Sequence, residues 1–136
     1  MKRILRYVIG FIIGLIAVFV VQFALTKIWS LAGVKWGPQN LPVENIQKIG
    51  MLFSTFISGL IGPFIALVIC KNSKWIIIGI FFLIAMSIDL YAVLNPLKEL
   101  DLWFKIIFVI LIPLQLFLAV KLFDSFKKKN SLQQRL

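Results

Sequence analysis

The chain contains no histidine and only one cysteine, Cys70, among its 136 residues. Without histidine, neither imidazole-based catalysis nor a zinc site with histidine ligands can form. A single cysteine excludes an internal disulfide and a cage of thiolates, so Cys70 is expected to be a small apolar filler. The sequence also has no glycine-rich phosphate loop and no nucleophile elbow. We therefore expect a protein that is not an enzyme and that holds no metal and no cofactor.

Acidic residues are scarce as well. There are five Asp and Glu against fifteen Lys and Arg, which gives a net charge of +10. In a soluble chain this balance would suggest binding to nucleic acid. Here no aromatic or glycine pattern accompanies the basic residues, so nucleic acid is not expected as a partner.

Long apolar runs fill most of the chain, which is 61% hydrophobic. Each run can cross a hydrocarbon core of about 30 Å, which takes about 20 helical residues. The runs are continuous rather than alternating, and this excludes the strands of a membrane barrel. The sequence therefore predicts an all-α integral membrane protein, a single domain over residues 1–136 in which four transmembrane helices form an antiparallel bundle. The predicted helices and the basic tail that follows them are 4–30, 46–70, 75–94, 102–123 and 124–136.

The first run, 4–30, follows basic residues, as a signal peptide does. Its apolar stretch exceeds the 7–15 residues of a signal peptide, and no A-x-A cleavage site follows. We therefore expect it to remain as a transmembrane helix.

The basic residues indicate the orientation. If the helices alternate in direction, one side of the membrane carries Lys2, Arg3, Arg6, Lys71, Lys74, Lys121, Lys127, Lys128, Lys129 and Arg135. The other side carries fewer cations together with three acids, namely Lys27, Lys35, Lys48, Lys98, Lys105, Glu44, Glu99 and Asp101. The side richer in Lys and Arg is expected to be cytoplasmic. Both termini are thus predicted to lie inside a bacterial cytoplasmic (inner) membrane, with the basic tail attracted to anionic headgroups. The three acids are expected to be solvated loop charges rather than a cation site.

Small residues recur every four positions along 46–70 and form a stripe on one face. Association of helices in lipid depends on such residues, because they allow the backbones to approach closely. We expect this stripe to be the central seam of the bundle, with a homodimer interface as the alternative. The stripe consists of Ser54, Ser58, Gly62 and Ala66. Gly10 and Gly14 have the same spacing in the first run.

Asp89 is the only acid within an apolar run. Counted from the helix centres, Gln22 and Thr55 lie at a similar depth, and Lys105 lies slightly nearer the outer surface. We expect Asp89 to face the bundle interior and to bond to Gln22, Thr55 or Lys105. An acid inside the membrane is a candidate proton or cation site. The sequence favours a structural role, in which an ion pair with Lys105 joins two helices.

Residues 54–123 carry a recognisable series of features. These are the small-residue helix STFISGLIGPFIA, the basic turn CKNSK, an apolar helix with SID near its end, Asn95-Pro96, LWF, and a last helix with a central proline, ILIP. The series resembles a widespread group of small, uncharacterised bacterial four-helix transmembrane proteins. In that group Asn usually stands where this chain has Asp89, and a Pro-His-Pro turn follows. The resemblance implies the fold and transfers no function.

Two classes of function remain open. The leading one is a multi-pass inner-membrane protein that is not an enzyme and acts through helix packing or as an accessory component, with the lipid bilayer and another membrane protein as partners. The alternative is a small homo-oligomeric transporter or channel, a homodimer in the simplest case, with Asp89 as its proton or cation site. Small multidrug transporters carry an acid in their first helix, and 4–30 has none. The long spacer 31–45 disfavours a holin-like pore.

Overall fold

The computed structural model describes residues 2–71 and 73–134. Within them the chain forms four α-helices and one short 3-10 turn. In order these are α1 (Lys2–Leu31), η1 (Pro38–Asn40), α2 (Asn45–Cys70), α3 (Lys74–Leu94) and α4 (Leu102–Gln133). Each α-helix is long and apolar enough to cross a membrane. The predicted all-helical class and the four apolar spans are therefore confirmed.

The helix ends differ from the predicted ends at both termini of the chain. α1 begins at Lys2, and α4 continues past residue 123 to Gln133. The expected end at 123 followed the loss of apolar residues, but Lys, Gln and Leu are all good helix formers and no Gly or Pro follows to stop the helix. The first part of the predicted tail is therefore a helical extension. Arg135, at the end of that tail, lies outside the described residues, as does Asn72 in the turn after α2.

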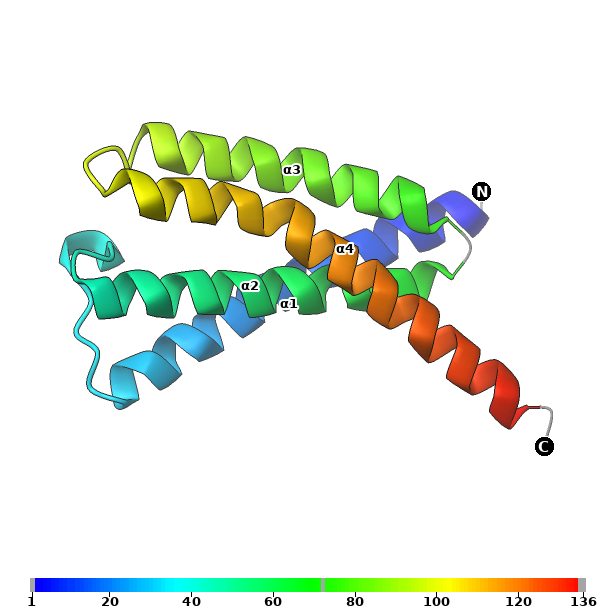
Figure 1. Cartoon of the computed structure of the whole chain (residues 1–136). Coiled ribbons are helices and arrows are strands. Elements are labelled where there is room, and N and C mark those ends of the chain that lie inside the picture. The colour runs from blue at the N-terminus through cyan, green and yellow to red at the C-terminus, as the bar shows by residue number, and fades with distance from the viewer. Residues whose placement is uncertain (1, 72, 135–136) are drawn as a thin grey trace.

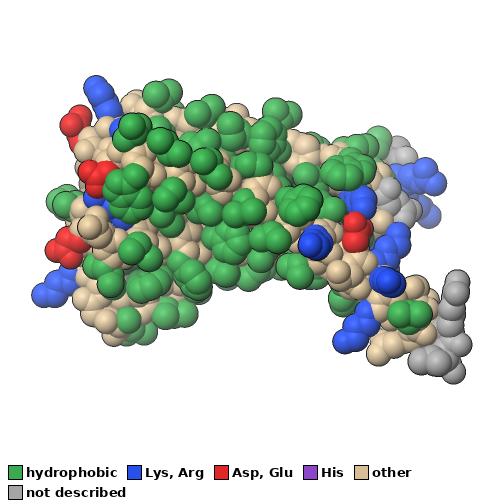
Figure 2. All heavy atoms as spheres, in the orientation of Figure 1, with side chains coloured by type: hydrophobic (Ala, Val, Ile, Leu, Met, Phe, Trp, Pro, Cys, Tyr) green, Lys and Arg blue, Asp and Glu red, His purple; other side chains and the backbone are tan. Residues whose placement is uncertain are grey.

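α2 is the central helix, since it packs against each of the other three. Figure 1 shows α3 beside the first half of α4, while α1 and the second half of α4 each cross α2 at an angle. The two chain ends lie toward the same end of the molecule (Figure 1). On the face shown in Figure 2, apolar side chains cover the middle of the molecule, and the charged side chains gather toward its two ends.

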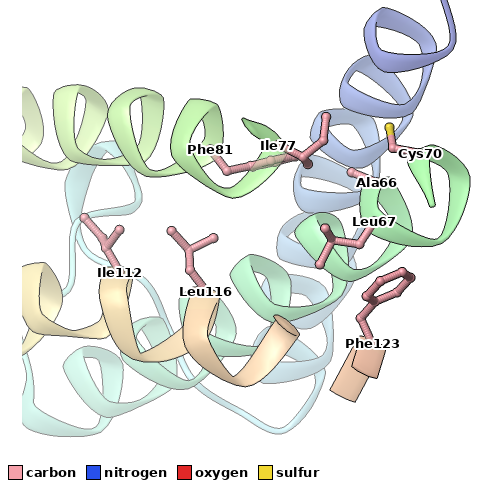
Figure 3. Close-up of a cluster of buried hydrophobic side chains, with 8 residues drawn as sticks. All are labelled: Ala66, Leu67, Cys70, Ile77, Phe81, Ile112, Leu116 and Phe123. Carbon is pink, nitrogen blue, oxygen red and sulfur yellow. The ribbon is translucent and has the colours of Figure 1, made fainter. Parts of the chain in front are cut away.

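Two groups of buried side chains fill the space between the helices. The larger group joins α2, α3 and α4, as Figure 3 shows, and consists of Ala66, Leu67, Cys70, Ile77, Phe81, Ile112, Leu116 and Phe123. The smaller group joins the loop before α4 to α4 itself and consists of Leu97, Phe104 and Phe108. Because lipid tails are as apolar as these side chains, the gain from this packing is dispersion contact rather than removal from water.

α1 and α2 approach closely through small residues. Gly10 and Gly14 are the buried residues of α1. A Cβ atom placed on Gly14 would lie 2.8 Å from the carbonyl oxygen of Gly62 and 2.9 Å from the Cβ of Ala66. All four residues of the predicted stripe are buried, and α1 of the same chain covers its Gly62–Ala66 part.

The connection from α2 to α3 is short, and hydrogen bonds hold it and the start of α3 to α1 and α4. Only residues 71–73 separate the two helices. The hydroxyls of Ser73 and Tyr7 share a hydrogen bond of 2.6 Å, which ties the turn to α1. The ammonium of Lys74 donates to both carboxylate oxygens of Asp124, at 2.9 and 2.8 Å, which ties the start of α3 to α4.

The close approach of α1 and α2 gives a test with a matched control. Gly14→Ala should lower the free energy of unfolding relative to Gly79→Ala by about 1–3 kcal/mol, the usual cost of overpacking. Both changes gain the same helix propensity, but a Cβ on Gly79 meets no atom within 4 Å. Titration of the folded protein from mild detergent into SDS measures the difference. Equal unfolding curves for the two variants would contradict the described seam.

Candidate intramembrane polar site

Asp89 lies on the side of α3 that packs against the bundle. Residues four apart share one face of a helix, and Ile77, Phe81 and Asp89 belong to one such series. Ile77 and Phe81 are buried, and Asp89, nearer the end of the helix, is half-buried. Among the described residues, the ion pairs are Lys48–Asp101 and Lys74–Asp124, so none reaches the Asp89 carboxylate.

Two of the three residues expected to bond Asp89, Gln22 and Lys105, have side chains that bond elsewhere. The Gln22 side-chain oxygen accepts a hydrogen bond from the Ser58 hydroxyl at 2.9 Å. That hydroxyl also lies 3.1 Å from the backbone carbonyl of Thr55, within its own helix. The Lys105 ammonium donates to the backbone carbonyl of Lys98 at 3.0 Å. The expected hydrogen bonds from Asp89 to Gln22, Thr55 and Lys105 are therefore absent from the described part of the chain.

Asp89, Gln22 and Lys105 lie at similar depths along their helices, but they are positioned by different helix pairs. Gln22 lies on the part of α1 that packs against α2, while the aromatic contact from α1 to α3, Phe11 to Phe81, lies nearer the chain ends, at 5.0 Å between ring centroids. Lys105 lies one turn into α4, and its long side chain reaches back to the loop between α3 and α4. Equal depth in the membrane thus does not bring side chains of different helix pairs together.

Polar side chains are buried between α1, α2 and α4 instead. Besides the bond between Gln22 and Ser58, the carboxamide of Gln115 packs directly against Gly59, in the space that a Cβ there would occupy. Gln115 is buried, and neither its side-chain oxygen nor the buried Ser54 hydroxyl has a hydrogen-bond partner among the described residues. A buried polar group without a partner costs about 1–3 kcal/mol. Sequence reasoning missed this contact, although a glycine beside Ser58 and a single glutamine in the apolar part of α4 were its signals.

A second polar cluster closes the opposite end of the molecule from the chain termini. The Lys48 side chain is buried, and its ammonium lies 2.5 Å from a carboxylate oxygen of Asp101 and 6.0 Å from the centre of the Trp103 ring. Hydrogen bonding from Lys48, together with its charge, holds the pKa of the Asp101 carboxyl below its ordinary value. One of the three predicted loop acids is thus paired to a buried cation.

The adjacent Gln47 holds the long loop between α1 and α2 in place. Its side-chain oxygen accepts hydrogen bonds from the backbone N–H groups of Val43 and Glu44, at 2.6 and 3.0 Å. Its amide nitrogen donates to the carbonyl of Lys35. Within the described residues no three His, Cys, Asp or Glu side chains come together as metal ligands, and Glu44 makes no ion pair there.

Two cavities lie between α3 and α4. One of about 620 Å³ is at the end that holds the chain termini and extends from Lys74 on α3 to Asp124 on α4. The other, of about 530 Å³, is at the opposite end and includes Lys98 and Lys105. Asp89 lies between their levels on α3 and lines neither of them.

Comparison of the chain with protein-family models, with curated proteins and with solved structures finds no match. The resemblance of residues 54–123 to small four-helix membrane proteins therefore rests on the sequence pattern alone.

The ion pair between Lys48 and Asp101 predicts that substituting one member costs more stability than substituting the other. Asp101→Asn should lower the thermal midpoint in detergent by several degrees, because it leaves the buried Lys48 ammonium without its carboxylate. Lys48→Met keeps the side-chain volume and leaves only an exposed carboxylate, so it should cost less. A larger loss in Lys48→Met than in Asp101→Asn would contradict this account.

The same pair predicts how stability depends on pH. The pKa of Asp101 is lower in the folded protein than the usual 3.8. Its contribution is therefore fully present above this unfolded value of 3.8 and is lost as the pH falls through the lower folded value. The difference in thermal midpoint between the wild type and Asp101→Asn should be constant from pH 8 to about pH 5 and shrink below about pH 4. Fluorescence-detected melting over this range measures the difference. A difference that already shrinks near neutral pH would contradict the assignment of the pH dependence to the Asp101 carboxyl.

Proposed function

We propose that this protein is a non-enzymatic accessory component of a bacterial cytoplasmic membrane that associates, through the Asp89 region of α3, with another membrane protein. The observation that carries the proposal is the half-buried Asp89, which has no ion-pair partner among the described residues. An aspartate in a membrane helix costs about 2.5–3.5 kcal/mol at the helix centre on insertion scales, and less toward the helix ends. Asp89 lies five residues before the end of α3. A cation or hydrogen-bond donor on a neighbouring protein would offset that cost.

The surroundings of Asp89 favour a contact made from outside the chain. Only Ile77 and Phe81 of α3 are buried. The residues next to Asp89 leave large apolar surfaces exposed, with Ile88 at 55% and Tyr91 at 67%. An apolar helix face with one ionisable group at its edge has the composition that specifies a partner helix in lipid, where packing and interhelical hydrogen bonds drive association.

The proposed arrangement in the membrane is an antiparallel bundle with both termini in the cytoplasm. It is supported by the position of the two chain ends at one end of the molecule (Figure 1) and by the basic residues near them. Lys2, Arg3, Arg6 and Lys71 are exposed there, along with the lysines of the α4 extension. The other end carries cations and acids together, as the pair of Lys48 and Asp101 illustrates. This asymmetry of Lys and Arg is the one that fixes orientation during insertion.

The alternative is a homo-oligomeric transporter or channel in which Asp89 binds a proton or a cation. The buried polar atoms of Ser54 and Gln115, which have no hydrogen-bond partner within residues 2–71 and 73–134, favour it, since a transport path needs polar groups at membrane depth. In this alternative, the contact at Asp89 is made with a second copy of the chain and not with a different protein.

Substitution of Asp89 separates the two functions. In the accessory role, Asp89→Leu should lower recovery of the partner by about tenfold, equivalent to about 1.4 kcal/mol, whereas Asp89→Asn keeps a hydrogen-bonding amide and should retain part of it. The measurement is native mass spectrometry of the gently solubilised, tagged protein from its host membrane, beside proton flux into vesicles that contain the purified protein. Neither variant should change the flux.

The control is Ser87→Leu, which alters an exposed polar residue of the same helix whose hydroxyl bonds within its own helix, to Leu83. It should leave the assembly intact. A homodimer whose proton flux disappears in Asp89→Asn would replace the accessory role with the transporter. Recovery of the same partner from wild type and Asp89→Leu would refute the proposed contact.

A further inference from the structure

The larger cavity between α3 and α4 is an apolar groove whose charged residues lie at one end only. α3 contributes Ile78, Gly79 and Phe82 to the groove. α4 contributes two adjacent rows of side chains on one face, and both rows begin at Pro113. Proline lacks the N–H that would continue the helical hydrogen bonds, and Figure 1 shows α4 beside α3 along its first half and diverging from it along its second half. The groove is the space that this divergence opens.

The length of the groove matches one leaflet of a bilayer. From Pro113 to Asp124, α4 rises by about 16 Å at 1.5 Å per residue. Half of a hydrocarbon core of about 30 Å is about 15 Å. Pro113 marks the inner end of the groove, and Lys74, Lys121 and Asp124 mark its outer end. An acyl chain lying along it would therefore run from the headgroup level to the midplane.

Of the charged side chains at the outer end of the groove, Lys121 is the one that can bind an anionic group. Lys74 is paired with Asp124, so these two side chains neutralise one another. Lys121 makes no ion pair with any described residue and is exposed. Trp75, which is 70% exposed, lies at the same end and carries an indole N–H that can donate a hydrogen bond. Despite the Asp124 carboxylate, the rim has a net positive charge.

From this combination we propose that the α3–α4 groove binds an anionic phospholipid of the leaflet next to the chain termini. One acyl chain lies along Ile78, Gly79 and Phe117, and the phosphate lies against the Lys121 ammonium and the Trp75 indole. The site is separate from Asp89, which does not line the groove, so the inference stands or falls independently of the proposed function.

Gly79 gives the groove its depth. A Cβ placed there would meet no atom within 4 Å, and the residue is exposed. The side chain of a leucine at this position would therefore begin in open space and extend into the groove. This allows the groove to be filled and its charge to be removed in two separate variants.

The test is retention of lipid by the purified full-length protein. Native mass spectrometry counts bound phosphatidylglycerol and phosphatidylcholine of identical acyl chains after incubation at equal concentrations. The wild type should prefer phosphatidylglycerol by about fivefold, the equivalent of about 1 kcal/mol for one basic residue near the membrane surface. Lys121→Gln should bring the preference close to one. Gly79→Leu should lower retention of both lipids several-fold.

Two control variants accompany the test. Lys129→Gln removes a charge of the same sign from the exposed helical extension, and Ala24→Leu enlarges an exposed residue of α1. Both should behave as the wild type. Quenching of Trp75 by brominated phosphatidylglycerol, taken as the difference between the wild type and Trp75→Phe, gives an independent readout. The other tryptophans, Trp29, Trp36 and Trp103, lie toward the opposite end of the helices.

Three outcomes would overturn the proposal. Equal retention of the two lipids by the wild type would show that the groove has no preference for anionic headgroups. An effect of Lys129→Gln as large as that of Lys121→Gln would assign the preference to the basic extension as a whole. A dimer that Gly79→Leu dissociates and Lys121→Gln leaves intact would assign the groove to a second copy of the chain.

Discussion

Helices in hydrocarbon gain little by hiding apolar surface from one another, so their association depends on how closely the backbones can approach. In this chain the approach is made where Gly14 of α1 meets Gly62 and Ala66 of α2. A Cβ on Gly14 would also come within 2.9 Å of the Phe81 ring on α3. The placement of α1 against the centre of α2 and the buried part of α3 therefore depends on the missing side chain at Gly14, and at Gly10 and Gly62 along the same seam.

The two ends of the bundle are closed by different means. At the end with the chain termini, the ties reach from the α2–α3 connection and the start of α3 to other helices, as between Tyr7 and Ser73 and between Lys74 and Asp124. At the other end, a buried ammonium and the Gln47 carboxamide organise the loops. Loops at a membrane surface have backbone groups that need partners, and buried polar side chains supply them there.

Hydropathy alone predicted the four spans, because a run of about 20 apolar residues has few other places to fold. Helical spacing was also sufficient to find the small-residue stripe of α2, from Ser54 to Ala66, whose members are all buried. The bonding of Asp89 was not predictable in this way. Counting residues along a helix gives depth, whereas contact also depends on rotation about the helix axis and on which helices are neighbours. Both come from packing, so Gln22 met Ser58 rather than Asp89.

The three-residue connection between α2 and α3 has a consequence for how the helices can move. So short a connection leaves no slack, so the start of α3 cannot shift far without moving the end of α2. Ser73 is hydrogen-bonded to Tyr7 of α1, and Lys74 is paired with Asp124 of α4. A displacement of the start of α3 would therefore be transmitted to each of the other three helices.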